Sequence, residues 1–148
     1  MAILNVYLNF NGNCKEAFDF YKSVFGGEFP YVGTFAEMPP QEGQDPLPDE
    51  MNDRIMHISL PISKETTLMG SDVGGEWAKD FKMGNNFTLS ITAQSKAEAD
   101  EIFNKLSENG KVTMPMDKTF WGDYFGMCID PFGVQWMMSF NETPAQKA

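Results

Sequence analysis

Apolar and polar residues alternate in several short segments of the chain. In residues 3–10 the polar set is Asn5, Tyr7 and Asn9, and the intervening residues are apolar. Residues 54–62 and 87–93 alternate in the same way. A side-chain period of two predicts β-strands with one apolar face. Shorter strands are predicted at residues 66–69, 111–116, 125–130 and 134–140.

Two other segments place apolar residues at helical spacing. The first follows Asn11-Gly12-Asn13 and ends at Gly26-Gly27, where glycine favours a helix C-terminus. The second begins at Ser95, with Glu98 three residues later, which is the arrangement of a capping box. The order strand, helix, strands therefore occurs twice, and this predicts a duplicated module.

The duplication predicts an α+β fold in which each helix covers one face of a small sheet. We expect a single domain over residues 1–148, with modules at 3–72 and 86–140, a glycine-rich connector at 73–85 and a polar tail at 141–148. Residues 36–53 contain four prolines and six acidic residues and are predicted to form a long exposed loop, with or without a short strand at its start. Two roles stay open for this loop, a lid or partner contact and a solvated excursion.

The charge balance excludes some classes of partner. The chain has 11 basic and 21 acidic residues, a formal net charge of −10, which disfavours nucleic acid and anionic membrane surfaces. Cys14 and Cys128 form no CxxC motif and are expected to be reduced, partly buried thiols. No signal peptide or apolar stretch of membrane-spanning length is evident, so a cytoplasmic location is expected by default.

Strand parity assigns a set of side chains to the sheet faces turned away from the helices. The set mixes hydrogen-bonding groups with soft apolar ones, a composition typical of small-molecule sites. Its members are Asn5, Tyr7, Asn9, His57, Ser59, Thr88, Ser90, Gln135, Met137 and Ser139.

Several motifs together resemble a known family. They are Asn9-Phe10-Asn11-Gly12-Asn13-Cys14, Phe25-Gly26-Gly27, His57-Ile58-Ser59-Leu60, Phe120-Trp121-Gly122 and Asp130-Pro131-Phe132-Gly133-Val134-Gln135-Trp136. They are similar to PhnB-like proteins of the glyoxalase/bleomycin-resistance/extradiol-dioxygenase superfamily, also called vicinal oxygen chelate. The resemblance implies two βαβββ modules that pair into an open, barrel-like sheet with a central cavity, and it makes a homodimer an expectation.

The same resemblance locates the metal ligands of the metal-dependent superfamily members. Carried onto this chain, those positions fall near Asn5, Met69, Asn86 and Met137. None of them is His, Asp, Glu or Cys, the residue types that bind zinc, iron or nickel. We therefore expect no catalytic metal and no cofactor.

His57 is the only histidine in the chain, and parity places it on the cavity side. Two interpretations stay open for it: ligand binding or acid–base chemistry, and a structural hydrogen-bond anchor. Trp121 is a candidate cavity wall, whereas Trp136 is expected in the core. Asp72 and Asp123 could each receive a ligand amine or cap a turn, and turn capping is the favoured interpretation. The candidate ligand-binding residues are Tyr7, Asn9, His57, Ser59, Met69, Ser90, Trp121, Gln135 and Met137.

Two functions follow from these expectations. The first is metal-free binding of a small, partly aromatic molecule in the cavity between the modules. The alternative is an enzyme with lyase, isomerase or transferase chemistry in which His57 is catalytic. The sequence does not name the ligand.

Overall fold

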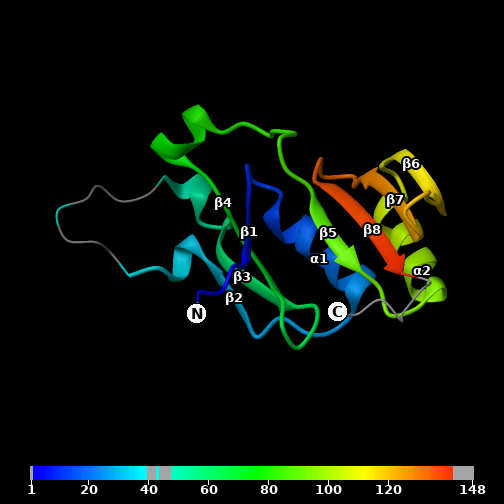
Figure 1. Cartoon of the computed structure of the whole chain (residues 1–148). Coiled ribbons are helices and arrows are strands. Elements are labelled where there is room, and N and C mark those ends of the chain that lie inside the picture. Colours follow the sequence, from blue (N-terminus) through cyan, green and yellow to red (C-terminus); the bar gives the residue numbers. More distant parts are fainter. Residues whose placement is uncertain (1, 40–42, 44–47, 142–148) are drawn as a thin grey trace. The chain divides into compact units, whose positions relative to one another are not determined.

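The computed structural model describes residues 2–39, 43 and 48–141. The chain forms two compact units, Met1–Lys82 and Met83–Ala148 (Figure 1). Each unit contains a four-stranded sheet and an α-helix, in the order strand, helix, strands. The predicted α+β class is therefore confirmed, and the sheets are open rather than closed barrels. No helix in the described part of the chain is long and apolar enough to cross a membrane.

The first unit has a sheet with strand order β1-β4-β3-β2. β1 runs parallel to β4, while β4 with β3 and β3 with β2 are antiparallel. The elements are β1 (Val6–Phe10), α1 (Cys14–Phe25), β2 (Tyr31–Thr34), β3 (Ile55–Pro61) and β4 (Thr67–Asp72), with 3₁₀ turns at Phe35–Glu37, Asp49–Met51 and Gly75–Asp80.

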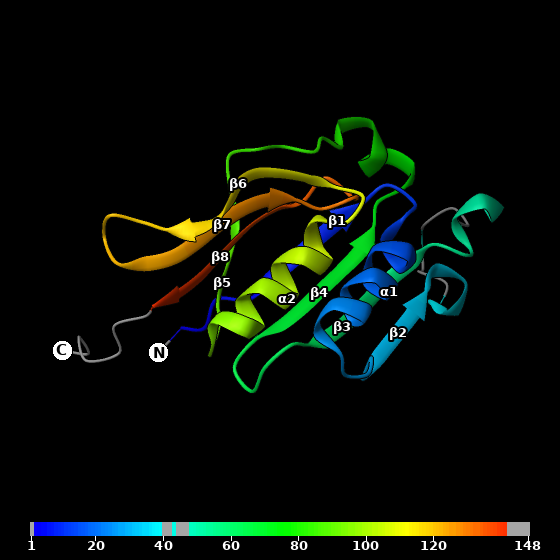
Figure 2. The same ribbon diagram turned by 90° about the vertical axis from the view of Figure 1, so that its right-hand side faces the viewer.

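The core of the first unit lies between α1 and its sheet. α1 packs against β3 and β4 (Figure 2). A Cβ at Gly70 of β4 would lie 2.6 Å from a ring carbon of Phe18, so the absent side chain allows the helix to approach the strand closely. The residues of α1 that are buried are Cys14, Ala17, Phe18, Tyr21 and Val24.

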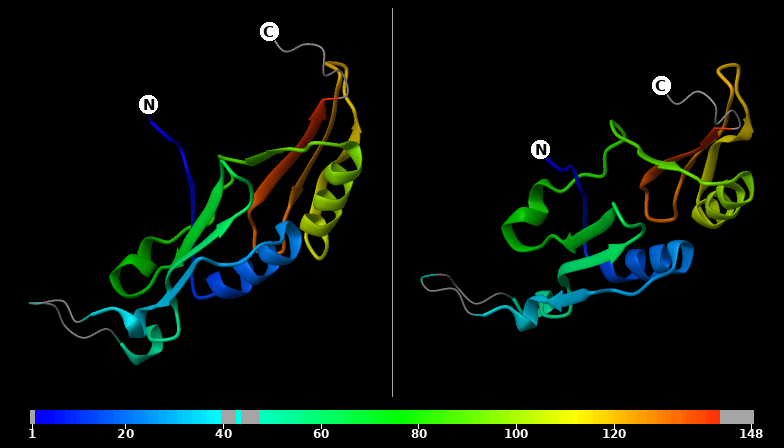
Figure 3. Two further views of the ribbon diagram at one scale, coloured as in Figure 1. Left: turned by 90° about the horizontal axis from the view of Figure 1, so that it is seen from below. Right: turned by 60° about the horizontal axis from the view of Figure 1, so that its bottom comes forward.

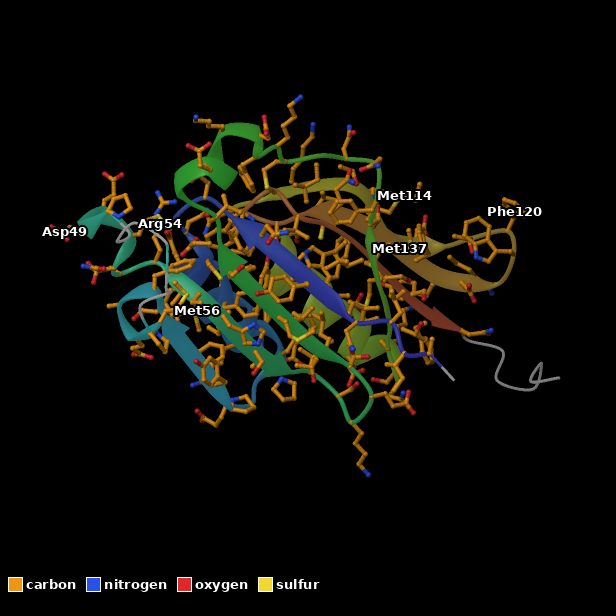
Figure 4. The ribbon with its side chains drawn as sticks, turned by 90° about the vertical axis from the view of Figure 1, so that its left-hand side faces the viewer. Asp49, Arg54, Met56, Met114, Phe120 and Met137 are labelled. Carbon is orange, nitrogen blue, oxygen red and sulfur yellow. The ribbon has the colours of Figure 1, made fainter. Side chains whose placement is uncertain are left out.

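A β-bulge in β3 changes which side chains of that strand face the core. Gly33 and Thr34 are consecutive in β2, yet they pair with His57 and Ile55, which leaves Met56 as an extra residue. One extra residue moves the side chains beyond it to the opposite face. Strict alternation was therefore wrong here: Ile55 is 3% exposed, whereas Met56 is only half-buried (Figure 4).

The second unit repeats the topology with strand order β5-β8-β7-β6. Its helix packs against β7, β8 and β6 (Figure 3). One half of the predicted capping box is present, because the Glu98 amide donates to Ser95 Oγ at 3.0 Å. Glu98 Oε1 accepts from the amide of Gln94, the residue before the N-cap, at 3.0 Å, rather than from the Ser95 amide. The elements are β5 (Leu89–Thr92), α2 (Lys96–Ser107), β6 (Lys111–Lys118), β7 (Asp123–Ile129) and β8 (Gln135–Asn141).

Some predicted boundaries differ from the observed ones. The first strand begins at Val6 rather than at residue 3, and Ile3 and Leu4 are 81% and 97% exposed. The strand predicted from residue 87 begins at Leu89, and Phe87 is 53% exposed. Within the predicted loop, residues 40–42 and 44–47 lie outside the described residues, as do residues 142–148 of the predicted tail.

Candidate functional site

His57 lies on the face of the first sheet that is turned away from α1. We call this side of each sheet its open face. The Tyr7 hydroxyl on β1 is 3.2 Å from His57 Nδ1, close enough for a hydrogen bond. The Tyr31 ring on β2 is 5.8 Å from the imidazole between ring centroids, and the Tyr7 ring is 5.6 Å from it. The histidine is thus flanked by two aromatic rings.

Gly33 makes room for one of these rings. Gly33 pairs with His57 across β2 and β3. A Cβ at Gly33 would lie 2.5 Å from the hydroxyl oxygen of Tyr31 and 2.9 Å from two of its ring carbons. The Tyr31 ring therefore folds over the glycine, toward His57, in space that any other residue would fill.

The two nitrogens of the His57 ring have different surroundings. Nδ1 is engaged by Tyr7, either as the acceptor of the tyrosine proton or as the donor to the hydroxyl oxygen. Nε2 has no hydrogen-bond partner among the described residues. Tyr7 and Tyr31 are 44% and 46% exposed, while His57 is half-buried. The ring therefore has one anchored nitrogen and one that a ligand can use.

The strand register brings other predicted residues to the same face. Tyr7 is paired with Met69, and Met69 is paired with Ser59. Asn9 is paired with Ser71 and is exposed. The first sheet therefore carries five of the predicted site residues on its open face, namely Tyr7, Asn9, His57, Ser59 and Met69.

The second unit brings fewer of the predicted site residues together. Ser90 on β5 is paired with Met137 on β8. The side-chain amide of Gln135 donates to the Phe87 carbonyl at 2.6 Å, so this side chain is already bonded to the backbone just before β5. Trp121 lies in the turn after β6 and donates to Asp123 at 3.1 Å, and Gln135 lies at the opposite end of β8. Trp121 and Gln135 are not brought together.

The donors at the expected metal-ligand positions do not fit a divalent transition metal. Asn5 precedes β1, and the strand neighbours of Met69 are Tyr7 and Ser59. Asn86 precedes β5, and the strand neighbours of Met137 are Ser90 and Met127. Thioethers beside a phenol and an alcohol are poor ligands for zinc, iron or nickel. Nor do the described residues contain a group of three or more His, Cys, Asp or Glu side chains that could hold a metal ion.

Two buried carboxylates serve the framework. Asp72 is 4% exposed and accepts hydrogen bonds from the amides of Gly12, Cys14 and Ile55 at 2.8, 3.0 and 2.9 Å. Its predicted turn-capping role is confirmed. Asp130 is 3% exposed and accepts from the Trp136 indole at 2.8 Å, and Trp136 lies in the core as predicted.

The two thiols are not nucleophiles at neutral pH. Burial, with a smaller contribution from Asp72, raises the pKa of Cys14 far above its ordinary value. Burial and the nearby Asp130 raise the pKa of Cys128 to about 11. Because the thiolate is the reactive form, both cysteines behave as core residues.

Tyr31 and Gly33 were not predicted as site residues. The segment Tyr31-Val32-Gly33-Thr34 has strand-forming residues, but it is short and adjoins a proline-rich segment. Gly33 was itself a signal, because a glycine within a strand often marks a place where another group comes close to the backbone. The group that comes close is the ring of Tyr31, only two positions earlier, and alternation patterns do not reveal such a contact.

Comparisons with known proteins place this geometry in a family. The model of the Glyoxalase/Bleomycin resistance protein/Dioxygenase superfamily matches residues 3–138. Protein YjdN of Escherichia coli K12 is 33% identical over 97% of this chain and 99% of its own length. The crystal structure of protein PA1353 from Pseudomonas aeruginosa is 37% identical, with a TM-score of 0.80 over 95% of this chain and 98% of that one.

The fold is also shared with the PhnB protein from Bacillus cereus, at a TM-score of 0.70 and 24% identity, over 93% of this chain and 98% of that one. This neighbour supports the resemblance to PhnB-like proteins at the level of fold. The match to the superfamily model covers both units and all the strands that carry the candidate residues. This protein therefore belongs to the Glyoxalase/Bleomycin resistance protein/Dioxygenase superfamily.

Proposed function

We propose that this protein binds a small, partly aromatic molecule, without a catalytic divalent metal, and that the His57 face of the first sheet recognises it. One observation carries the proposal: a half-buried imidazole, whose Nε2 has no partner in the part of the chain that the structure describes, stands between two tyrosines that are each nearly half exposed. Aromatic faces with a few convergent polar groups are the usual composition of a small-molecule site.

The proposed contacts follow from the residues of this face. An aromatic ring of the ligand stacks on Tyr7 or Tyr31, because offset or edge-to-face aromatic pairs are favourable. A polar group of the ligand bonds to His57 Nε2 or to the half-buried Ser59. The Met69 thioether, between Tyr7 and Ser59, supplies a soft apolar contact. The cavity expected between the two modules remains a prediction.

One observation favours the alternative, an enzyme. The Tyr7 hydroxyl and His57 Nδ1 share a hydrogen bond, so a proton taken up at Nε2 leaves a cation that the tyrosine oxygen can stabilise. This arrangement suits general acid–base catalysis of an isomerisation, elimination or transfer reaction. It needs no metal ion.

Titration followed by NMR tests the binding proposal directly. The chain has a single histidine, so its imidazole signals need no further assignment. We expect at least one of the probes phenol, benzoate, benzylamine and indole to shift the His57 signals saturably. Tyr31→Ala should weaken that binding, whereas Tyr124→Phe, on the α2 side of the second sheet, should not. No saturable shift with any probe would overturn the proposal.

The same samples separate binding from catalysis. A bound probe that stays unchanged for hours in the presence of the wild-type protein supports plain binding. Conversion of a probe that is lost in His57→Gln, with the fold retained, supports the enzyme. Zinc, iron, manganese or nickel at stoichiometric levels, after purification without chelator or affinity tag, would contradict the metal-free part of the proposal.

A homodimer and a cytoplasmic location are also proposed. The dimer comes from the superfamily resemblance, and light scattering of the purified protein measures it. Fractionation of cells that express the protein measures the location.

A further inference from the structure

Three methionines lie side by side across the second sheet. Met114 on β6 is paired with Met127 on β7, and Met127 is paired with Met137 on β8. Figure 4 labels the two outer members, Met114 and Met137. We call Met114, Met127 and Met137 the methionine row. Ser90 on β5, the partner of Met137, ends the row.

The methionine row belongs to the open face of this sheet. Along β7 and β8, the buried residues Gly126, Cys128, Trp136 and Met138 face α2, and Met127 and Met137 alternate with them. Cross-strand partners share a face, which places Met114 with Met127. Met116 is not a member, because its sulfur lies 2.6 Å from where a Cβ of Gly126 would be, on the α2 side.

The spacing allows the three sulfur atoms to converge. Directly paired residues on neighbouring strands have Cβ atoms about 4.5–5.5 Å apart. Methionine has three rotatable side-chain bonds, so the outer two can lean over the middle one. Met114 is 45% exposed, and Met127 and Met137 are half-buried, so the row is accessible to a small ion.

We propose that the methionine row binds a soft monovalent metal ion, Cu(I), through its three thioethers. Thioether sulfur selects Cu(I) over zinc, magnesium or calcium, which prefer nitrogen, thiolate or oxygen donors. None of the residues paired within the row is a carboxylate or an imidazole that would favour a harder ion. The net charge of −10 raises the local concentration of any cation. The three methionines belong to the second unit, whereas His57 belongs to the first.

Binding at thioethers has a distinctive pH dependence. A thioether carries no proton, so the metal displaces none, unlike binding at a thiolate or imidazole. The affinity for Cu(I) at the methionine row should therefore stay constant between about pH 5.5 and pH 8. Binding at Cys14 or Cys128 would instead weaken as the pH falls, because burial keeps both thiols protonated.

The test uses Cu(I) itself, titrated without oxygen against a chromophoric Cu(I) chelator, and Ag(I) as a redox-inert probe of protein labelled at the methionine methyl groups. We expect a single bound ion, shifts of three methyl signals, and the same affinity at both pH values. Met127→Leu should weaken binding by about tenfold or more. Met116→Leu, on the α2 side of the same sheet, and Met56→Leu, in the first unit, should not change it.

Three outcomes would overturn the site. The first is a Cu(I) affinity that is unchanged in Met127→Leu. The second is a Cu(I) affinity that decreases as the pH is lowered. The third is Ag(I)-induced shifts of methionine methyl signals outside the row. The last outcome would leave the row as an apolar contact surface only. Because the NMR probes of His57 report on the other unit, failure of the Cu(I) site and failure of the proposed ligand site are distinguishable.

Discussion

The two units share one topology but hold their helix N-termini differently. In the second unit the device is local: Ser95 caps α2 and Glu98 bonds back to the Gln94 amide. In the first unit Asn13 makes no side-chain capping bond, and Asp72, 58 residues along the chain from Cys14, accepts the Cys14 amide instead. Orphan amides at the two helix N-termini, that of Glu98 in α2 and that of Cys14 in α1, are thus satisfied by unrelated acceptors.

The turns before the last strand of each unit, β4 and β8, also have different polar supports. In the first unit Ser63 accepts the amides of Glu65 and Thr66 in the turn before β4. In the second unit Asp130 holds the turn before β8 by accepting the amides of Phe132 and Val134. Thus the apolar pattern maintains the topology, while the polar supports are specific to each unit.

The open faces differ more than the supports. The first sheet presents His57 with Tyr7 and Tyr31, and the second presents the methionine row. A face that does not have to pack under its own helix can change composition without changing the strand order. The duplicated fold therefore offers two chemically distinct surfaces, one for hydrogen bonding and one for soft contacts.

The largest effect is expected at Asp72. Asp72→Ala leaves the buried amides of Cys14 and Ile55 and the part-buried amide of Gly12 without an acceptor. It also removes the hydrogen bonds that connect the start of α1 and the start of β3 to the end of β4. We expect the free energy of unfolding to fall by about 3–5 kcal/mol, since each unsatisfied buried donor is costly. Urea denaturation measures this. Asp19→Ala, at an exposed ion pair on α1, is the control and should change stability little. A loss at Asp72 no larger than that would contradict the remote-cap account.

A smaller effect is expected at Asp130. Asp130→Ala removes the acceptor of two turn amides and of the Trp136 indole. We expect a loss of about 2–4 kcal/mol, because these bonds of Asp130 connect only residues 130–136, whereas those of Asp72 join three segments of the first unit. Near-ultraviolet circular dichroism reports the environment of Trp136 as well as the unfolding transition. If the Trp136 signal stayed native and stability unchanged, the carboxylate would not be the support of the second unit.

The sequence predicts best those elements whose stabilising contacts join residues that are close together along the chain. The Ser95 cap and the alternation of the strands that became β7 and β8 involve neighbours in sequence, and the structure contains them. The strand ends were less accurate, because Ile3 and Leu4 continue an apolar pattern without finding a strand partner. Pairing across the sheet, which the pattern does not encode, decides where a strand begins.

Prediction of the candidate site is limited in the same way, by pairing between strands that the sequence pattern does not encode. Parity placed Tyr7, His57 and Ser59 on one face, but the bulge at Met56 reverses the parity of Ile55, and only the pairing with β2 reveals it. Tyr31 joins His57 because Gly33 lacks a side chain, a relation among three residues on two strands. The pairing of Met114 with Met127 likewise depends on irregular register in β6.

The helix caps offer a matched pair of substitutions with a modest effect. Ser95→Ala removes the acceptor of the Glu98 amide and should cost about 1 kcal/mol. Asn13→Ala, at the corresponding position of α1, should cost only about 0.5 kcal/mol or less, since its side chain makes no capping bond. Thermal and urea unfolding of both variants give the comparison. Equal losses would mean that the two helices are capped alike, contrary to the structure.

The last comparison concerns the two thiols, one in each unit. Each folded-state pKa lies above the ordinary value of 9.0, to about 11 for Cys128 and higher for Cys14. Below pH 9 both the folded and unfolded thiols are protonated, so their contribution to stability is complete. As pH rises from 9 toward 11, the unfolded chain loses protons first, and the free energy of unfolding falls.

Iodoacetamide alkylation resolves the two thiols, since the thiolate is the form that reacts. In native protein we expect neither cysteine to react appreciably at about pH 8, and Cys128 to react before Cys14 as the pH is raised. Peptide mass spectrometry reads each site, and urea-unfolded protein, in which both should react readily, is the control. Because Asp72 contributes to the raised pKa of Cys14, Asp72→Asn should lower the pH at which Cys14 begins to react, and so bring it closer to the pH at which Cys128 reacts. If Cys14 reacted first in the wild type, the second unit, not the first, would have the more protected core.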